Sequence, residues 1–272
     1  MKYRTFSVRA AITLLGATAI LSTGQAAASA KDWRIDAQAE IDAYTDAHPT
    51  DYVGRDRLLV KYGLPPMQVR IDGIGRDLTA AEAQKEMNAR KAAESKAPAA
   101  ISIRAVPTDA FSVSVTINYD LYLNRVVVGS WNFRDNFVNG SNPDDVATVQ
   151  ANLGSCFRTG SMVRKAADYT GKDYTGNTYV DDGGVNGSPI FGVRDRVSGF
   201  KMLTDNGYFR VTYNKTNASG CGSAKMGAQF QYEHNQDGGS GFSASAGWGF
   251  FSVSYGGAAN NKLRKSTDPL WL

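Results

Sequence analysis

The sequence predicts a mainly β protein: an antiparallel β-sandwich or barrel-like domain preceded by an N-terminal helical segment, α+β overall. Three observations carry this prediction. Apolar residues recur every three to four positions before residue 100 and every two positions after it, and glycine is concentrated beyond residue 129. Turn signals also separate the short apolar runs of the second half. We therefore divide the chain into residues 1–30, 31–100 and 101–272.

The first 30 residues have the three parts of a cleavable secretory signal. Basic residues precede an apolar stretch over residues 10–21, and small residues then continue up to Ala30. We expect cleavage between Ala30 and Lys31. The apolar run is shorter than the roughly 20 residues that span a bilayer, so a stable membrane anchor is not expected. The mature protein is predicted to be secreted and extracellular.

Removal of this signal leaves a nearly neutral protein. The whole chain has 30 basic and 26 acidic residues, and residues 1–30 contain three basic and no acidic ones, which leaves 27 against 26. A protein with so little net charge exerts a weak electrostatic pull on phosphate backbones. We therefore expect no nucleic-acid partner.

The chain has two cysteines, Cys156 and Cys221, both in the part expected outside the cytoplasm. An even pair in an oxidising compartment is most simply a disulfide, here closing a loop of about 65 residues. A reactive thiol is the alternative, but the sequence has neither a C-x-x-C motif nor a histidine close to either cysteine.

Helical signals cover residues 31–100. A first helix is expected to begin near Trp33, to carry Ala37, Ile41 and Tyr44 on one stripe, and to end before Pro49. A second is expected over residues 55–62, where Gly63 provides the C-terminal cap and prolines follow.

A third helix is expected over residues 79–97. Thr79 and Glu82 have the spacing of a capping box, in which each side chain satisfies a free backbone N–H group of the other residue. Met87 is the only large apolar residue of this segment, so it reads as a solvated helix or a helical linker. A partner-binding helix is the alternative.

Strand signals begin after residue 101. Strict alternation over residues 111–119 predicts a strand with one buried and one solvent-exposed face, and residues 126–133 its return strand. Residues 142–153 are expected to begin with an Asn-Pro turn and to form a short helix. Further strands are expected within residues 191–197, 200–203, 208–213, 226–232 and 242–255.

The segment over residues 240–255 has two interpretations. Its aromatic and small apolar residues alternate with glycine and serine, and the alternation changes phase at Phe250-Phe251. A core strand with a bulge at that point explains the pattern. A membrane-inserting hairpin of a pore-forming toxin is the alternative.

Residues 184–191 resemble the G-x-S-G-S/G-P segment around the nucleophile of chymotrypsin-like serine proteases, particularly the glutamyl endopeptidases. The resemblance covers about eight residues, and Asn186 occupies the position of the nucleophile, where it cannot attack a carbonyl. Ser188 has no identifiable partner, and the chain offers His48 and His234 as the possible bases. A turn between two strands explains this segment better.

Metal and cofactor signals are also missing. The two histidines lack the spacing of a zinc site, so no metal and no cofactor are expected. Residues 181–186 and 235–239 offer oxygen ligands for calcium, but turn chemistry accounts for both segments. Several carboxylates are available for glycoside hydrolysis, although sequence cannot give their separation. They are Asp181, Asp182, Asp195 and Glu233.

The strongest binding signal is the tyrosine series Tyr169, Tyr174 and Tyr179, which recurs at a five-residue spacing. Tyrosine offers an apolar ring and a polar tip, which suit a sugar ring or a protein partner. Cross-strand pairing of the same residues is the alternative.

These observations favour a secreted protein without a recognisable catalytic centre, most simply a binding or surface-interaction protein whose partner is a cell-surface glycan or an extracellular protein. Two other classes stay open. One is a secreted hydrolase with glycoside-type carboxylate chemistry in which Glu233 meets a second acid or His234, and the other is a β-pore-forming toxin.

Overall fold

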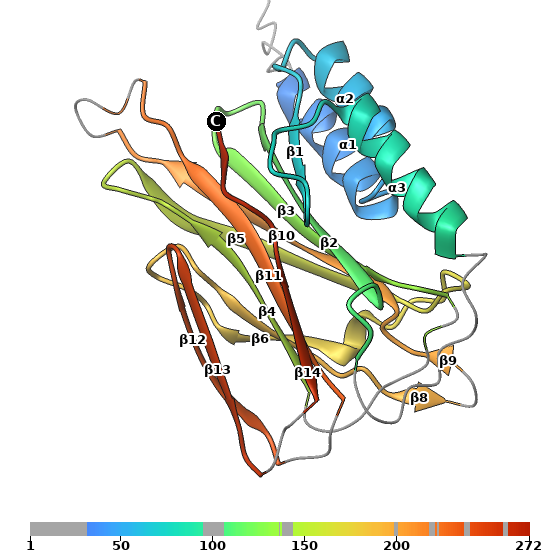
Figure 1. The fold of residues 1–272 in the computed structure, drawn as a ribbon. Helices are drawn as coiled ribbons and strands as arrows, with labels where there is room; N and C mark the ends of the chain where they lie inside the picture. Colours follow the sequence, from blue (N-terminus) through green and yellow to red (C-terminus); the bar gives the residue numbers. More distant parts are fainter. Residues whose placement is uncertain are drawn as a thin grey trace, which may run out of the picture. The chain divides into compact units, whose positions relative to one another are not determined.

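The computed structural model describes residues 32–94, 106–135, 137, 144–198, 201–217, 221, 223–236, 240–257 and 261–272. The expected signal and its cleavage site at Ala30 and Lys31 lie outside these residues, and so do the expected turns at residues 142–143 and 237–239. Residues Arg34–Leu272 form one compact unit. Figure 1 shows this unit as helices, two stacked sheets and a separate hairpin.

The first sheet has five antiparallel strands in the order β1-β2-β3-β10-β5. Its strands are β1 (Gln68–Ile71), β2 (Phe111–Tyr119), β3 (Arg125–Phe133), β10 (Asn206–Lys215) and β5 (Phe157–Ala167). The alternating residues that predicted β2, and the return strand after it, are therefore placed as expected.

The second sheet is also antiparallel and has the order β14-β11-β4-β7-β6, with β15 paired to the end of β11. Its strands are β14 (Lys262–Ser266), β11 (Gly227–Asn235), β4 (Asp145–Ala151), β7 (Ile190–Val193), β6 (Thr178–Asp182) and β15 (Leu270–Trp271). The described part also contains the short pair β8 (Val197–Ser198) and β9 (Lys201–Met202), and a 3-10 turn over Thr175–Asn177.

The main core lies between these two sheets. Val113, Val115 and Val211 from the first sheet share one buried cluster with Val149 and Phe230 from the second. The aromatic rings of Phe191 and Phe209 stack across the interface with their centroids 4.0 Å apart. The predicted sandwich class is thus confirmed, because two apolar sheet faces bury each other.

Three helices cover the outer face of the first sheet: α1 (Trp33–Ala47), α2 (Tyr52–Lys61) and α3 (Ala80–Glu94) (Figure 1). The prediction that β2 has a solvent-exposed face is wrong, since Ser114 and Thr116 are fully covered. The Tyr52 hydroxyl donates to Ser114 Oγ at 2.8 Å, and the Arg55 guanidinium donates to Thr116 Oγ1 at 3.0 Å. Period-two alternation separates apolar from polar residues, and here the polar side is buried under hydrogen-bonding groups.

The helical region departs from its prediction in two ways. The capping box is present, with the Thr79 backbone N–H donating to Glu82 Oε2 at 2.9 Å. However, α3 is not simply solvated, because Ala83 is fully buried in the cluster beneath the helices. Because alanine side chains are small, α3 packs closely against the buried cluster. A helix that packs through alanines has no stripe of large apolar residues by which the sequence would predict its buried face. The segment also contributes strand β1, which the helical interpretation of residues 31–100 missed.

The expected short helix after residue 142 is wrong, because Asp145–Ala151 forms the central strand β4. Val146 and Val149 fit a three-residue helical spacing, but in the strand they point to opposite faces. Val149 joins the core between the sheets, whereas Val146 packs under the β12–β13 hairpin. A strand buried on both faces has no alternating polar pattern to identify it.

The core-strand interpretation of residues 240–255 is also wrong, because they form a hairpin that is a sheet of its own. Strands β12 (Phe242–Gly247) and β13 (Phe250–Tyr255) pair with each other around a turn at Trp248-Gly249. The phase change at Phe250 therefore marks a turn rather than a bulge. Apolar side chains of one hairpin face pack on the second sheet, while the serines of the other face are exposed.

The predicted disulfide is confirmed: Cys156 and Cys221 are joined, with their Cα atoms 5.3 Å apart. It links the turn between β4 and β5 to the segment between β10 and β11. Across the described residues, no helix has both the length and the apolarity needed to cross a bilayer.

Candidate functional site

Several turns from both sheets meet at one end of the sandwich. The Tyr213 hydroxyl, near the end of β10, donates to the Gly187 carbonyl in the β6–β7 turn at 2.9 Å. Arg125, which opens β3, donates through Nη2 to the Ala224 carbonyl at 3.4 Å. The β2–β3 and β6–β7 turns and the disulfide therefore lie at this end. Leu272 exchanges backbone hydrogen bonds with Met226, which places the described C-terminal residues there as well.

Large apolar side chains are exposed at this end. We name it the apolar loop end and define it by the following residues. They are the exposed Tyr122, Leu123, Val185, Phe250 and Trp271, together with the half-buried Trp248. Val185 is 95% exposed, Leu123 57%, Phe250 54%, Tyr122 47% and Trp271 46%. The rings of Trp248 and Trp271 meet edge to face with centroids 5.5 Å apart. Exposed apolar groups gathered in one region typically mark an interaction surface.

The backbone of the β2–β3 turn is built to present two of these side chains. Leu123 has a φ of 64°, a left-handed conformation that is unfavourable for a bulky residue. The Asp120 carboxylate stabilises the turn by accepting hydrogen bonds from the backbone N–H groups of Tyr122 and Asn124 at 2.9 and 2.8 Å. Strained residues that the surrounding structure holds in place often occur at functional sites. The turn thus holds Tyr122 and Leu123 in the solvent.

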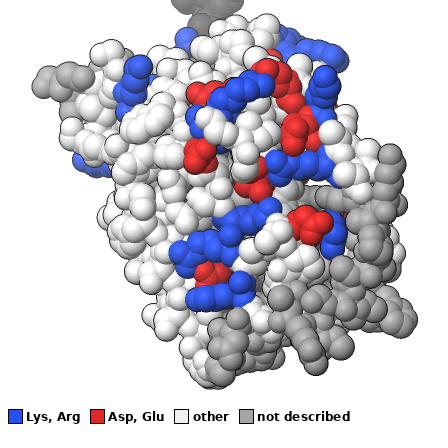
Figure 2. All heavy atoms as spheres, viewed as in Figure 1, with Lys and Arg blue, Asp and Glu red and all other residues white. Residues whose placement is uncertain are grey.

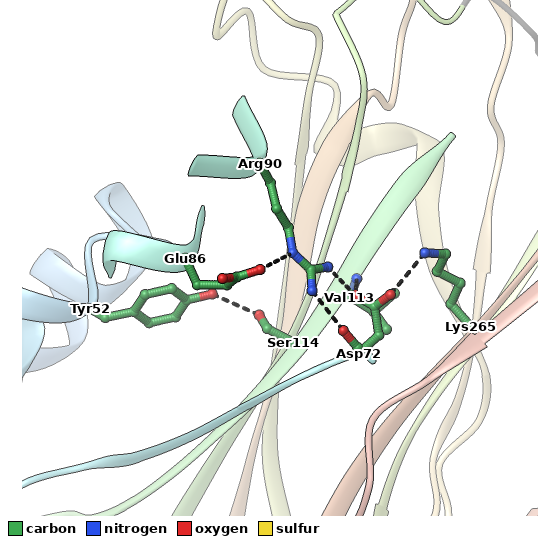
Figure 3. Close-up of polar contacts among 7 residues, drawn as sticks. All are labelled: Tyr52, Asp72, Glu86, Arg90, Val113, Ser114 and Lys265. Atoms are coloured by element: carbon green, nitrogen blue, oxygen red, sulfur yellow. Dashed lines mark hydrogen bonds and ion pairs between the residues drawn. The ribbon is translucent and has the colours of Figure 1, made fainter. Parts of the chain in front are cut away.

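A separate polar cluster joins the helices to both sheets through Asp72 (Figure 3). Its carboxylate accepts hydrogen bonds from the Val113 backbone N–H at 2.9 Å and from Arg90 Nη1 at 3.0 Å, and Lys265 Nζ lies 2.8 Å away. Arg90 is also paired with Glu86 at 2.9 Å. Because Asp72 holds α3, β2 and β14 together, the cluster has a clear structural role.

A pocket of about 350 Å³ lies beside this cluster and is lined by Asp72, Arg90, Asp109, Arg134 and Lys265, among others. Its charges are already paired, since Arg134 Nη1 donates to Asp109 at 2.8 Å. Figure 2 shows that Lys and Arg are also mixed with Asp and Glu over the rest of the visible face. Interleaved charges of both signs do not form the one-sign patch that attracts a polyanion.

A second polar cluster is buried at the opposite end of the second sheet and consists of Asp145, Asp195 and His234. The His234 Nδ1 atom lies 2.8 Å from Asp145 Oδ2 and 3.4 Å from Asp195 Oδ2, and all three side chains have no exposed surface. Asp145 also accepts hydrogen bonds from the Tyr232 hydroxyl at 2.8 Å and from the Asn235 backbone N–H at 2.9 Å. Burial, together with the Asp145 carboxylate, raises the pKa of Asp195 well above its ordinary value.

Glu233 does not join this cluster, although it neighbours His234 in the sequence. Successive residues of β11 point to opposite faces, and Glu233 is ion-paired with Arg264 on the other face. His234 does meet two acids, as the hydrolase alternative requires, but these acids are Asp145 and Asp195. Their complete burial leaves no surface for a substrate in this conformation.

The three tyrosines of the binding hypothesis are placed differently from one another. Tyr169 is 47% exposed in a turn after β5, and Tyr174 is half-buried with Lys172 over its ring. The Tyr179 hydroxyl donates to Asp144 Oδ2 at 2.9 Å, and Arg194 covers its ring. The rings of Tyr174 and Tyr179 are thus covered by different cations, Lys172 and Arg194, and a shared binding site for the three tyrosines stays a prediction.

The segment that resembles a protease nucleophile loop forms the β6–β7 turn. Asn186 Nδ2 donates to the Ala246 carbonyl at 3.0 Å, and its Oδ1 accepts from the Ser188 backbone N–H at 3.1 Å. Gly184 and Gly187 have φ values of 61° and 88°, which explains why glycines stand at these positions. The segment connects the hairpin to the second sheet and displays Val185.

The fold defines a two-sheet antiparallel sandwich with a helical layer on one outer face and a hairpin on the other. No family model and no curated protein matches the sequence. Among solved structures, the chain is similar to the C-terminal domain of the antigen I/II-family protein AspA of Streptococcus pyogenes, with a TM-score of 0.29 and 7% identity over 57% of this chain and 53% of that chain.

Two further structures give similar values. The C-terminal domain of the AgI/II polypeptide BspA of Streptococcus agalactiae has a TM-score of 0.26 and 9% identity, over 58% of this chain and 57% of that chain. A structure concerning pH-induced modulation of Streptococcus parasanguinis adhesion by Fap1 fimbriae has a TM-score of 0.23 and 10% identity, over 57% and 78%. The chain spans just over half the length of the antigen I/II-family structures. At TM-scores this low, the similarity supports no inference about function.

Proposed function

We propose that this chain is an exported, non-enzymatic binding protein that attaches to an extracellular partner, a cell-surface glycan or a secreted protein, through the apolar loop end. The observation that carries the proposal is the exposure of Leu123, Val185, Phe250 and Trp271 at one end of the sandwich. Aromatic side chains bury a large area with few rotatable bonds, and they dominate the energetics of many binding surfaces.

Export is supported by two independent features. Residues 1–30 have the pattern of a secretory signal, and Cys156 and Cys221 form a disulfide, which persists outside the reducing cytoplasm. An extracellular protein also has cell-surface glycans and secreted proteins within its reach.

The test is a binding screen of the mature protein against immobilised cell-wall glycans and secreted proteins. Trp271→Ala and Phe250→Ala are expected to weaken the strongest interaction at least about tenfold, as for residues at the centre of an interface. Tyr169→Ala is the matched control, because Tyr169 is similarly exposed but lies at the opposite end of β5. Loss of binding in the Tyr169 variant alone would transfer the site to the tyrosine segment, and no binding by folded protein would refute the proposal.

Pore formation is a second candidate, favoured by the hairpin. Strands β12 and β13 pair with each other and with no other strand in the described residues, and their serines face the solvent while their apolar face is covered. We infer that such a hairpin can detach from the second sheet, on which it packs, and present its apolar face to lipid. Release of a trapped dye from liposomes is the expected result, and intact vesicles at high protein concentration exclude this function.

A further inference from the structure

The carboxylates of Asp145 and Asp195 are both buried beside a single histidine, so within the described residues their negative charge is not balanced. Both oxygens of Asp195 lack a hydrogen-bond partner although the side chain is completely buried. Leaving an ionised carboxylate without water or a partner costs several kcal/mol. A buried polar group without a partner in a folded protein calls for an explanation, and a bound ion is one of them.

The geometry of the three side chains is that of a ligand set. One oxygen of each carboxylate and one ring nitrogen of His234 all lie within 4.8 Å of one another. The separation of His234 Nδ1 from Asp195 Oδ2 is 3.4 Å, which is about the distance between two ligand atoms on one tetrahedral zinc ion. The 2.8 Å contact between His234 and Asp145 would lengthen by about half an ångström on binding.

We propose that Asp145, Asp195 and His234 bind one divalent metal ion of the zinc class, which fastens together the start of β4, the segment after β7 and the end of β11. The imidazole ligand selects zinc-class ions over calcium and magnesium, which prefer oxygen ligands alone. A charge of +2 balances both carboxylates. Three protein ligands leave the fourth tetrahedral position for a water molecule.

The surroundings of the cluster support this assignment. The Tyr232 hydroxyl donates to Asp145 Oδ2, and the Asn235 backbone N–H donates to Asp145 Oδ1. These hydrogen bonds orient the carboxylate, as is usual for a metal ligand. The rings of Phe133 and Phe137 pack at centroid distances of 5.0 and 5.8 Å from His234 and exclude water from one side.

This site is not predictable from the sequence alone, because the three ligands lie far apart along the chain. The antiparallel pairing of β4 with β11 brings Asp145 and His234 together, and Asp195 enters from the segment that follows β7. The one available signal was that His234 shares a strand face with Phe230 and Tyr232, which predicts a buried histidine.

The test uses the mature protein, stripped with a chelator and dialysed against Zn²⁺. We expect about one Zn²⁺ per chain, a melting temperature that rises with Zn²⁺ concentration, and visible absorption bands of a tetrahedral site after Co²⁺ is substituted. Asp195→Asn is expected to weaken Zn²⁺ affinity at least about tenfold. In the stripped state, however, this variant should be as stable as the wild type or more so, because it removes an unpartnered buried carboxylate.

Glu233→Gln is the matched control, since it neutralises the acid next to His234 on the other face of β11. Its Zn²⁺ affinity should equal that of the wild type. Circular dichroism establishes that each variant is folded. The proposal is overturned if stripped and zinc-treated wild-type protein melt at the same temperature with no bound metal, if calcium alone binds, or if Glu233→Gln and Asp195→Asn lose Zn²⁺ equally.

Discussion

The contact between Gly129 and Phe230 gives a direct test of how the two sheets stack. Gly129 lies in the middle of β3, and a Cβ atom added there would overlap the ring of Phe230, which comes from β11 in the opposite sheet. Phe230 is completely buried and cannot move aside into solvent. Gly129→Ala should therefore overpack the core, at a cost of about 1–3 kcal/mol.

The gain from replacing glycine in a strand offsets about 0.5–1 kcal/mol of this cost, which leaves a net loss of about 1–2 kcal/mol. For a chain of this size, that loss lowers the Tm by about 2–8 °C. Thermal unfolding followed by circular dichroism measures the change. The control is Gly75→Ala, because nothing lies within 4 Å of a Cβ at that exposed position and its stability should stay within about 0.5 kcal/mol.

A second substitution makes the test specific to this contact. Phe230→Leu alone should destabilise the core, but it also removes the ring that an alanine at position 129 would meet. The double variant is therefore expected to be more stable than the sum of the two single effects predicts. Additive effects, or a Gly129→Ala variant as stable as the wild type, would show that β3 and β11 do not face each other in this way.

Three further predictions concern stability. Asp72→Ala should cost about 2–4 kcal/mol in a urea titration, because it leaves Arg90 and Lys265 partly buried without their shared partner, and a loss below 0.5 kcal/mol would contradict the role assigned to Asp72. Replacing both Cys156 and Cys221 by serine should cost up to about 4 kcal/mol, since the 65-residue separation gives the disulfide a large effect on the unfolded chain, and an unchanged denaturation midpoint in oxidising buffer would contradict this. Hydrogen bonds from Tyr44 and from a backbone N–H lower the pKa of Asp51 below 3.8. The ionised Asp51 therefore contributes to the free energy of unfolding above pH 3.8, and this contribution is lost as the pH falls through the lowered pKa. Asp51→Asn should make the free energy of unfolding depend less on pH in that acidic range, and an unaltered pH profile would count against the N-cap role.

The fold class was predictable because period-two alternation survives wherever one strand face is apolar. Residues 111–119 show this alternation. The alternation does not show what covers the polar face, so it cannot predict that Tyr52 and Arg55 bury the hydroxyls of Ser114 and Thr116. Residues 145–151 were misassigned for a related reason, since a strand buried on both faces has no polar side.

The candidate sites were less predictable because they depend on contacts between distant segments. The apolar loop end gathers four separate segments of the sequence, and each contributes one or two of its apolar residues. In the sequence, Val185 lies within a segment that resembles a protease loop, and Phe250 lies within an alternating pattern that is typical of a core strand. The hairpin turn at Trp248-Gly249 exposes Phe250, and this turn is visible in the sequence as glycines on both sides of Trp248.

Hydrogen–deuterium exchange on the protein, free and with the strongest partner from the binding screen, tests the central proposal most directly. We expect the partner to slow exchange in residues 120–124, 183–189 and 247–250, which are turns of the apolar loop end. Slower exchange confined to residues 168–174, or to the pocket beside Asp72, would contradict it.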